Sequence, residues 1–544
     1  MNQDPLRDLL AQGLSDEELA RALLDLTLQA APPEVADAVR VCAIPAWFDA
    51  SLLALLTDQD EKEIITLLEQ VAAFSFVLPR DGGGYVYHEA TRARLLDWWR
   101  EPENRPRFAA LNERLARHYL ALARQQRPRL SGPGYLDALT VMDATYPNVR
   151  AAWEGIVESG DWELTRDFAY ALHDYFQRRG LWAEWIAWTQ AGLEACERAG
   201  DAESCAAMQN NLGNAYWALP TGDRAANLQQ AIQCYQEALR VYTAGAAPLD
   251  YAATQNNLGT AYLRLPTGDR AANLAQAIRC YREALRFRTA EAAPLDYAMT
   301  QNNLGTAYLR LPTGDRAANL QKAIQCYQEA LRIEHLPSRS RARYLRNLGD
   351  AYGELENYTS AIAAYQQAID LTSDDPWLFN ALGNAYSCQE QHEQAVEAYT
   401  AALDLATADE DKALLYRNRA SDLIHLGRLD EAEQDIEQAR ALAPDHPYTH
   451  ARLGQLAFAR EDYPAAVEHY TAAIDRQPEA GFYFDRGLAH LALGHQDQAL
   501  ADYQAAIPLA DSITIAEALK ELNEFAADHP DTPGLDAIRA LLET

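Results

Sequence analysis

Side chains suited to chemistry recur at fixed intervals along this chain of 544 residues. Three of its seven cysteines stand 46 residues apart, namely Cys234, Cys280 and Cys326. A catalytic thiolate needs one activated environment, whereas equivalent positions in a series are typical of packing residues. His446 and His450 are four residues apart, but no third metal ligand lies near them in sequence. We therefore expect no catalytic residue, no metal site and no cofactor.

Amide side chains form a second series, and their chemistry suits the recognition of a ligand. The first row stands three residues before a repeated glycine position and comprises Asn210, Asn256, Asn302, Arg346, Asn380 and Arg417. The second row follows it by one residue and comprises Asn211, Asn257, Asn303, Asn347 and Asn418. Each Asn offers a donor and an acceptor, so a row of amides can pair with the backbone of an extended peptide. The alternative is that the second row only ties one helix to its neighbour.

A repeated unit must position both rows. The string Leu-Pro-Thr-Gly-Asp-Arg-Ala-Ala-Asn-Leu starts at Leu219, Leu265 and Leu311. The repeated position is occupied by Gly213, Gly259, Gly305, Gly349, Gly383, Ala420, Gly454 and Gly487, in steps of 46, 46, 44, 34, 37, 34 and 33 residues. The longer units carry six extra residues in each turn, and a period near 34 residues indicates a helix-turn-helix array.

Each unit reads as two amphipathic helices, which we name helix A and helix B. Leu258, Gly259 and Tyr262 line one face of a helix A. Ala277 and Tyr281 recur at helical spacing on the following helix B. These Leu-Gly-x-x-Tyr and Ala-x-x-x-Tyr elements resemble the tetratricopeptide (TPR) repeat family. The resemblance implies an all-α, right-handed solenoid of about eight repeats, with the first row facing a concave groove that binds a protein or peptide.

The segment before the array has a different pattern. Helices are expected at 33–43, 49–56, 61–73 and 89–100, with a β-hairpin between 75 and 88 around a Gly-rich turn. This resembles the winged-helix domain of STAND-class signalling NTPases, including NB-ARC proteins. In that family a Met-His-Asp-like motif follows the wing and its His contacts the nucleotide. Here Tyr87-His88-Glu89 stands in that place. One interpretation is that His88 contacts a nucleotide or another domain. The alternative is that His88 only closes the hairpin.

The NTPase motor of that family has no counterpart in this sequence. A phosphate-binding P-loop needs Gly-Lys-Ser/Thr, and no Gly-Lys pair occurs here. The chain therefore resembles the regulatory and sensor half of such an NTPase, either standing free or with the NTPase domain supplied in trans.

The boundaries follow from these patterns. We expect an N-terminal helical segment at 1–30, the winged-helix-like domain at 31–100, an Arg-rich helical linker at 101–145, degenerate TPR-like hairpins at 146–205 with a helix starting near Tyr146, the TPR array at 206–508 and capping helices at 509–544.

Charge narrows the class of partner. The formal net charge is −32, and residues 31–100 hold 11 acidic against 6 basic side chains. Because DNA binding needs phosphate neutralisation, we expect no nucleic-acid partner. A winged-helix transcription regulator remains the alternative. Residues 251–350 hold 14 basic and 8 acidic side chains, whereas residues 351–544 hold 11 and 35, so the array is polarised.

Two local patterns have a functional and a structural interpretation. Seven arginines between 105 and 129 either meet an acidic partner, cover a solvated helix face or contact the acidic repeats of this chain. The repeated Pro-Thr-Gly-Asp-Arg turns either display Asp and Arg side chains or need Pro, Gly and a capping Asp for the turn itself.

The sequence thus predicts a non-catalytic sensor or adaptor of bacterial signalling, whose groove binds a protein and whose winged-helix region relays to an effector; its oligomeric state stays open. With seven cysteines and no apolar span of membrane length, we expect reduced thiols in a cytoplasm and no membrane partner. A regulatory subunit of a separately encoded protease or NTPase is a further alternative.

Overall fold

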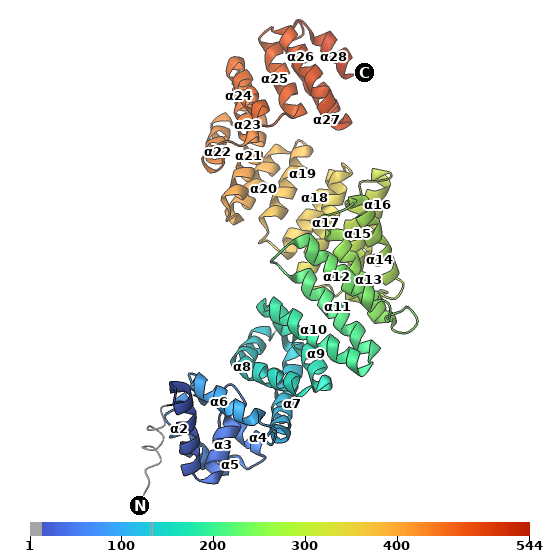
Figure 1. Ribbon diagram of the computed structural model, residues 1–544. Helices are drawn as coiled ribbons and strands as arrows, with labels where there is room; N and C mark the ends of the chain where they lie inside the picture. The colour runs from blue at the N-terminus through green and yellow to red at the C-terminus, as the bar shows by residue number, and fades with distance from the viewer. Residues whose placement is uncertain (1–13, 131, 133, 544) are drawn as a thin grey trace, which may run out of the picture. The chain divides into compact units, whose positions relative to one another are not determined.

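The computed structural model describes residues 14–130, 132 and 134–543. Within them the chain forms 27 α-helices, one short 3-10 helix and one two-stranded β-hairpin (Figure 1). It divides into two compact units, Met1–Phe287 and Arg288–Thr544. The prediction of a helical repeat array with a single hairpin near the N-terminus is confirmed.

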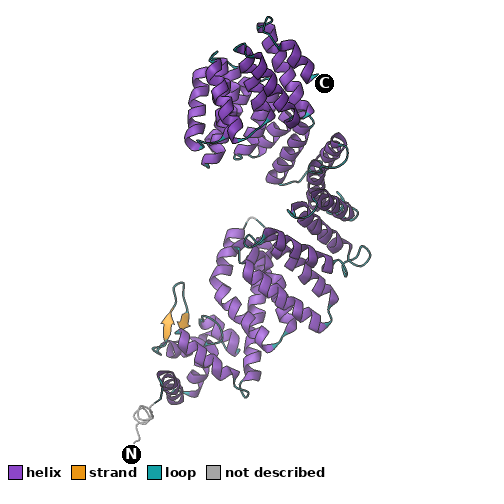
Figure 2. Cartoon of the chain, turned by 45° about the horizontal axis from the view of Figure 1, so that its top comes forward, coloured by secondary structure: helices purple, strands orange, loops and turns teal. Residues whose placement is uncertain are grey.

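The N-terminal part of the first unit consists of short helices and the hairpin, drawn in orange in Figure 2. Its elements are α2 (Asp16–Ala30), α3 (Pro33–Cys42), α4 (Ala50–Thr57), α5 (Glu61–Ala72), β1 (Val77–Pro79), β2 (Tyr85–Tyr87) and α6 (Glu89–Arg100). The strands are antiparallel, with Val77 opposite Tyr87. Tyr87 lies in the core and donates its hydroxyl to the carbonyl of Val39 at 2.8 Å. The hairpin is therefore fixed to α3 rather than free in solvent.

Four longer helices follow as antiparallel pairs: α7 (Arg105–Leu130), α8 (Tyr135–Ser159), α9 (Trp162–Arg179) and α10 (Trp182–Ala199). The expected helix start near Tyr146 is wrong, because α8 begins at Tyr135 and contains Pro147 in its interior. Proline removes one backbone donor from a helix and crowds the preceding turn. Next to it, the fully buried Asn148 accepts hydrogen bonds from the backbone N–H groups of Ala46 and Trp47, so tertiary contacts hold the helix through this point.

Eight helix pairs make up the repeat array. They are α11 (Ala202–Ala218) with α12 (Arg224–Ala238), α13 (Pro248–Arg264) with α14 (Arg270–Ala284), α15 (Pro294–Leu309) with α16 (Arg316–Leu331), α17 (Ser338–Glu354) with α18 (Tyr358–Leu371), α19 (Pro376–Cys388) with α20 (His392–Leu405), α21 (Asp409–His425) with α22 (Leu429–Leu442), α23 (Pro447–Ala459) with α24 (Tyr463–Arg476), and α25 (Ala480–Ala492) with α26 (Gln496–Ala506). The first two pairs belong to the first unit and the other six to the second.

One contact closes nearly every pair. The repeated glycine of helix A lies against the ring of the helix-B tyrosine, and a Cβ on Gly383 would stand 2.6 Å from the Tyr399 ring. The helix-B alanine four residues before that tyrosine is fully buried in all eight pairs. Where Ala420 replaces the glycine, Ile436 replaces the tyrosine. The small residue and the ring are therefore matched in volume, as close packing requires.

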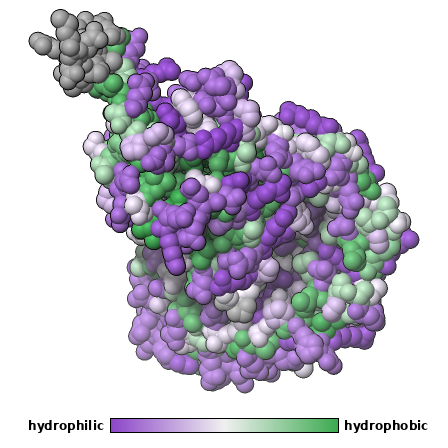
Figure 3. All heavy atoms as spheres, turned by 90° about the horizontal axis from the view of Figure 1, so that it is seen from below, coloured by the Kyte–Doolittle hydropathy of each residue, from purple (hydrophilic) through white to green (hydrophobic). Residues whose placement is uncertain are grey.

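The array ends in a cap of η1 (Ile507–Leu509), α27 (Ser512–Asp528) and α28 (Leu535–Leu542). Leu522 and Ile538 from the cap are fully buried with Tyr503 of α26. A terminal repeat needs such a cover for its apolar face. Outside these contacts, the face drawn in Figure 3 is mostly hydrophilic, with apolar side chains in the furrows between polar ones.

Candidate functional site

The two amide rows form a hydrogen-bonded ladder between successive helices A. The Nδ2 group of Asn347 donates to Oδ1 of Asn302 at 2.8 Å, and Asn418 donates in the same way to Asn380 at 3.0 Å. In the first unit Asn257 donates to Asn210 at 3.3 Å. A second-row amide thus binds the first-row amide of the preceding repeat. The second row therefore ties each helix A to the helix A of the preceding repeat.

The ladder changes wherever one row departs from Asn. Ala381 occupies a second-row position and has no donor, and the preceding first-row residue is Arg346. The Arg346 guanidinium instead donates to Asp375 at 3.1 Å. Arg452 occupies the second-row position that follows Arg417, and two cations cannot form this bond. The amide–amide hydrogen bond of the ladder is therefore absent at both of these steps.

The ladder leaves donors of the first row unused. Asn302 and Asn380 are 5% and 8% exposed, and among the described residues their Nδ2 groups donate to no acceptor. Because each Oδ1 is held by the next repeat, the orientation of each amide is fixed. Arg417 is 6% exposed, and its Nη1 atom is buried without an acceptor in the described part of the chain. Burial, and then the charge of Arg452, lowers the pKa of Arg417. These groups can receive carbonyl or carboxylate oxygens.

The other predicted groove residues differ in exposure. Asn256 is 4% exposed, whereas Asn210 and Arg346 are half-buried. In the second unit the structure places Arg346 with Arg339 and Arg343 on one face of α17, around a cavity of about 360 Å³ that Asp374 and Asp375 also line. Arg343 is exposed and has no carboxylate within ion-pair distance among the described residues. It is therefore a free cation beside the ladder, and the sequence argument missed it.

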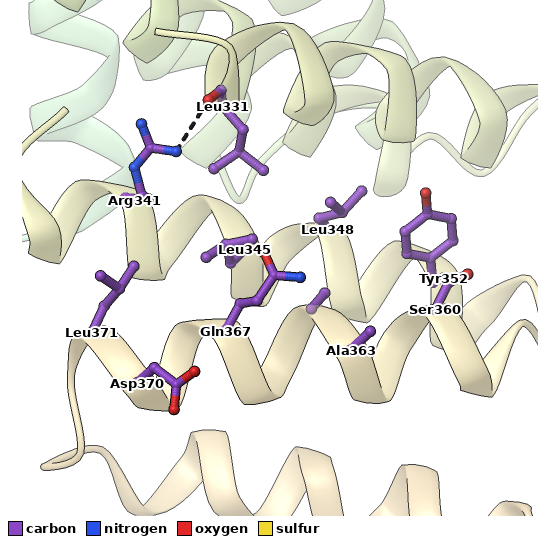
Figure 4. A pocket seen from close by; sticks show the side chains of 11 residues that line it. Leu331, Arg341, Leu345, Leu348, Tyr352, Ser360, Ala363, Gln367, Asp370 and Leu371 are labelled. Atoms are coloured by element: carbon purple, nitrogen blue, oxygen red, sulfur yellow. Dashed lines mark hydrogen bonds between the residues drawn. The ribbon is translucent and has the colours of Figure 1, made fainter. Parts of the chain in front are cut away.

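A larger cavity of about 690 Å³ opens on another face of α17 (Figure 4). Leu345 and Leu348 of α17 form its apolar wall, and Gln367 and Asp370 of α18 line the other side. Arg341 donates to the carbonyl of Leu331 at 3.2 Å and so closes the end near α16. With its cation already occupied by backbone carbonyls, this furrow has the character of a packing gap between helix pairs.

His88 precedes α6 and its side chain is exposed. Its backbone N–H donates to the carbonyl of Phe76 at 3.0 Å and continues the pairing of the two strands. The geometry thus accounts for His88 as the residue that closes the hairpin; a nucleotide or domain contact stays a prediction.

The Arg-rich helix α7 finds its acidic partners inside the first unit. Arg107 bonds Asp37 at 2.6 Å, and Arg124 bonds Asp167 at 2.7 Å. Arg127 bonds Asp174 at 2.9 Å. These ion pairs connect α7 to α3 and α9 within the first unit. The segment predicted as a linker is a packed member of a helical hairpin.

The repeated Pro-Thr-Gly-Asp-Arg turns use their own polar groups. Asp269 accepts a hydrogen bond from the N–H of Ala271 at 2.9 Å and caps α14. Arg270 donates to the carbonyl of Leu263 at 2.8 Å at the end of α13, and Gly268 has a φ of 80°. The other two copies repeat these contacts. The residue types of this turn follow from helix capping and the left-handed glycine.

The residues first considered for catalysis lie in the packing. Cys234, Cys280 and Cys326 are buried, and burial raises the pKa of Cys234 to about 11 and that of Cys280 to about 12. The described residues contain no group of three His, Cys, Asp or Glu side chains placed to hold a metal ion. None of the helices described is long and apolar enough to cross a membrane.

Acidic side chains of the C-terminal helix were not foreseen near the array. Lys520 of α27 bonds Glu390 at the end of α19. Burial raises the pKa of the Cys388 thiol, the Tyr358 hydroxyl opposes this, and the carboxylate of Glu517 adds to the rise. The acidic helix α27 therefore lies close to the ends of earlier repeats of its own unit, a contact of long sequence separation that no local pattern signals.

The geometry as a whole is that of an α-helical repeat protein. Residues 349–390 match a model of the TPR repeat, and residues 378–413, 411–479 and 451–512 match models of the tetratricopeptide repeat. Residues 349–512 therefore carry tetratricopeptide repeats. Repeats of this kind imply interaction with another protein.

Curated relatives share short stretches with the chain. The DnaJ homolog subfamily C member 7 homolog of Dictyostelium discoideum is 30% identical over 118 residues, 22% of each chain. The Hsp70-Hsp90 organizing protein of Triticum aestivum is 30% identical over 104 residues, 19% of this chain and 18% of that protein. The chain thus spans about a fifth of the length of the curated relatives it matches.

Among solved structures, the chain is similar to a Signal Transduction ATPase with Numerous Domains (STAND) protein with a tetratricopeptide repeat sensor from Pyrococcus horikoshii. The TM-score is 0.54 at 14% identity, and the match covers 86% of this chain and 66% of that one. At this identity the likeness concerns the fold.

Proposed function

We propose that this chain is a non-catalytic adaptor or sensor that binds an extended peptide segment of a partner protein along the helix-A face of its second unit. The observation that supports this proposal is a set of side-chain N–H donors that are held in place but have no acceptor within the described part of the chain. Asn302 and Asn380 hold their amides in place through the ladder, and Arg417 keeps a buried nitrogen without an acceptor. An extended peptide supplies carbonyl oxygens at regular intervals, and leaving a buried donor without a partner costs about 1–3 kcal/mol.

The cavity of about 360 Å³ beside Arg343 would add a preference for an acidic side chain on the bound peptide. Arg343 is exposed and unpaired, and it lies beside Arg339 and Arg346, which meet Asp374 and Asp375. A carboxylate on the partner near Arg343 would gain a charge-assisted hydrogen bond.

The N-terminal part supports a relay role within the first unit. Asn148 of α8 binds the backbone of Trp47 in both directions, at 2.9 and 3.0 Å, and donates to Tyr119 at 2.8 Å. Arg80 of the hairpin stands over the Trp47 ring at 4.4 Å and donates to the carbonyl of Ala144. These contacts fix the hairpin domain on α7 and α8, so we propose that this winged-helix-like domain presents a stable surface to a separately encoded effector.

The setting we propose is the cytoplasm of a bacterial signalling system. All seven cysteines are free thiols, which suits a reducing compartment.

Affinity capture with the full chain tests the groove. We compare the unmodified chain with Arg343→Glu, which reverses an exposed and unpaired charge, and with Arg440→Glu as the control. Arg440 is an exposed arginine of helix B that pairs with Glu437 at i,i+3. We expect a protein that the unmodified chain and the control retain and that Arg343→Glu loses. Because the relatives include Hsp70-Hsp90 organizing proteins, chaperones are identified first. Equal recovery by all three chains would contradict the groove proposal.

A further inference from the structure

The first unit contains a second basic surface that the amide ladder does not use. A cavity of about 710 Å³ lies where α9, α10, α11 and α13 come together at the helix-A ends. Its lining includes three arginines and two tryptophans, namely Arg178, Arg224, Arg264, Trp182 and Trp217. We name it the Arg–Trp pocket. Its volume lies within the range of about 300–1,000 Å³ that ligand pockets occupy.

The cations of this pocket lack acidic partners. Among the described residues, Arg178, Arg224 and Arg264 form no ion pair. The one carboxylate in the lining, Asp174, is already engaged by Arg127 and by His173, both at 2.9 Å. The pocket therefore carries a net positive charge that the chain itself does not neutralise.

The arginines are gathered around one indole. Arg264 stands over the Trp217 ring at 5.1 Å from its centre, and Arg224 at 5.9 Å. Burial, and then the like charge of Arg264, lowers the pKa of Arg224. The Nε1 group of Trp217 is buried and has no acceptor in the described part of the chain. An acceptor oxygen entering here would meet two cations beside a flat apolar surface.

The first repeat copy is altered at this place. Trp217 occupies the position that Leu263 and Leu309 fill in the next two copies, whose turns are otherwise the same. The substitution enlarges the apolar surface at the pocket. The packing of the repeat does not require it, because leucine serves the same position in the other copies.

In the second unit, a helix of the same chain lies near the equivalent edge of the repeats. Arg264 stands five residues after its repeated glycine, and Cys388 and His425 stand at the same position in later repeats. There the acidic helix α27 approaches, with Glu517 acting on Cys388 and Glu524 acting on His425. A helix of the same chain is thus accommodated at the equivalent edge of later repeats, where its Lys520 bonds Glu390, two residues after Cys388.

We propose that the Arg–Trp pocket binds an acidic segment of a partner protein, with carboxylates on Arg178 and Arg264 and an apolar side chain against Trp217. This site is separate from the amide ladder, and shares with the proposed function only the premise that the chain binds proteins. The contacts are charge-assisted hydrogen bonds and apolar burial against an indole. Binding weakens as salt is added.

Fluorescence anisotropy with the full chain tests this proposal. The probe is a fluorescein-labelled peptide of Glu and Leu, and the reference is the same peptide with Lys in place of Glu. The variants are Arg264→Ala, which introduces the residue present at Ala218, and Trp217→Leu, which introduces the residue present at Leu263. The control is Arg240→Ala, an exposed arginine of the same unit that pairs with Glu237 at 2.8 Å.

We expect the Glu/Leu peptide to bind and the Lys/Leu peptide not to bind. Arg264→Ala should weaken binding about tenfold, the usual scale for losing one charged hydrogen bond, and Trp217→Leu should weaken it through the lost apolar contact, with the control unchanged. Thermal melting of each variant checks that it folds. No binding of the acidic peptide, or binding that both pocket variants leave unchanged, would overturn the proposal.

Two further measurements separate this site from others. ATP and inorganic phosphate are added as competitors; if they bind in an Arg264-dependent way while the peptide does not, the pocket is a small-anion site and the proposal is wrong. Arg343→Glu is measured with the same peptide. If that variant abolishes peptide binding and Arg264→Ala does not, the peptide occupies the α17 face, which refutes the pocket and leaves the proposed function standing.

Discussion

The long repeats and the short repeats of this chain keep the same interior and differ in their turns. In a 46-residue repeat, Gly259 faces Tyr281 and a Cβ there would lie 2.9 Å from the ring. In a shorter repeat, Gly383 faces Tyr399 and the corresponding distance is 2.6 Å. The six extra residues of each long turn are held by capping contacts of their own, such as the Asp269 cap of α14. Repeat length is therefore a property of the surface, and helix packing is shared.

The comparison also shows where recognition can change without loss of the fold. The Gly–Tyr contact and the buried alanine recur in both kinds of repeat. The residues at the ends of helix A vary, from Trp217 and Arg264 in long repeats to Cys388 and His425 in short ones. Both surfaces that we propose for binding, the first amide row and the Arg–Trp pocket at the helix ends, therefore lie where the repeats differ from one another.

The largest effect is expected at the shared interior. Gly383→Ala places a methyl group 2.6 Å from the Tyr399 ring, closer than atoms can pack, so the helix pair must separate. We expect a loss of about 1–3 kcal/mol in the local stability of α19 and α20, the usual cost of overpacking. Gly259→Ala should cost less, because its contact is 2.9 Å. Native-state hydrogen exchange of the two pairs measures both values.

The repeat with Ala420 supplies the rescue variant. There the alanine faces Ile436 in place of a tyrosine. Adding Tyr399→Ile to Gly383→Ala should therefore recover part of the lost stability. The volume-matching explanation fails if Gly383→Ala does not change stability. It also fails if the double variant loses the sum of the two single-variant effects, with Tyr399→Ile measured alone.

A smaller effect is expected from the ladder, which both kinds of repeat share. Asn347→Ala removes the 2.8 Å bond to Asn302 and leaves a carbonyl oxygen of a residue that is only 5% exposed without its donor. We expect a loss of about 1–2 kcal/mol, the cost of an unsatisfied buried acceptor. Hydrogen exchange of α15 and α17 within the second unit reports it.

An exposed amide of the same chemistry serves as the control for that substitution. Gln389 donates to the hydroxyl of Thr359 at 2.8 Å on the surface. Gln389→Ala should change stability by less than about 0.5 kcal/mol, as surface substitutions do. Equal effects for Asn347→Ala and Gln389→Ala would show that the ladder is not a buried, coupling element.

The sequence predicted the fold because its signals are local and repeated. Eight equivalent positions, seven glycines and Ala420, predict the helix pairs, and the residues around Gly82-Gly83-Gly84 predict the hairpin. The start of α8 was wrong because Pro147 usually marks a first helical turn. Here the long-range bonds of Asn148 to Ala46 and Trp47 stabilise a helix that runs through the proline. Local propensity cannot report a partner about a hundred residues away.

The candidate site was predicted in part. Spacing located both amide rows, but it could not show that the second-row Nδ2 groups donate to the Oδ1 atoms of the first row. Arg343 and the Arg–Trp pocket were missed because neither forms a motif: Arg178, Trp217 and Arg264 meet only when helices from three hairpins pack. The signal available was the departure of Trp217 from the leucine of its two sister copies.

The last repeat has a phenylalanine and a carboxylate in the two amide rows, and this departure has an electrostatic consequence. Phe484 and Asp485 of α25 replace the two amide-row residues, and α27, which carries Glu521, packs against α25. Burial, and then the charge of Glu521, raises the pKa of Asp485, with Arg452 opposing. Glu521 is an exposed residue, but partial desolvation of its carboxylate, and then the charges of Glu517 and Glu524, raise its pKa as well, with Lys520 opposing. Burial, and then the charges of these two carboxylates, raise the pKa values of Tyr470 and Tyr503.

The smallest effect, and the one that separates this cap from the other repeats, is therefore a dependence on pH. Since the folded cap holds protons that the unfolded chain has already released, its stability falls as pH rises from the ordinary carboxyl pKa near 4 through the raised folded value. We expect α25 to α28 to exchange hydrogens more slowly at pH 5 than at pH 8, after correction for the intrinsic exchange rate. Asp485→Asn should remove most of that difference and stabilise the cap at pH 8. Helices α19 and α20 serve as the internal control, because the contact between Gly383 and Tyr399 holds no titrating carboxylate, and their exchange should show no such dependence on pH. A cap whose stability is the same at both pH values, or a slope that survives Asp485→Asn, would mean that the two carboxylates remain ionised and solvated in the folded protein.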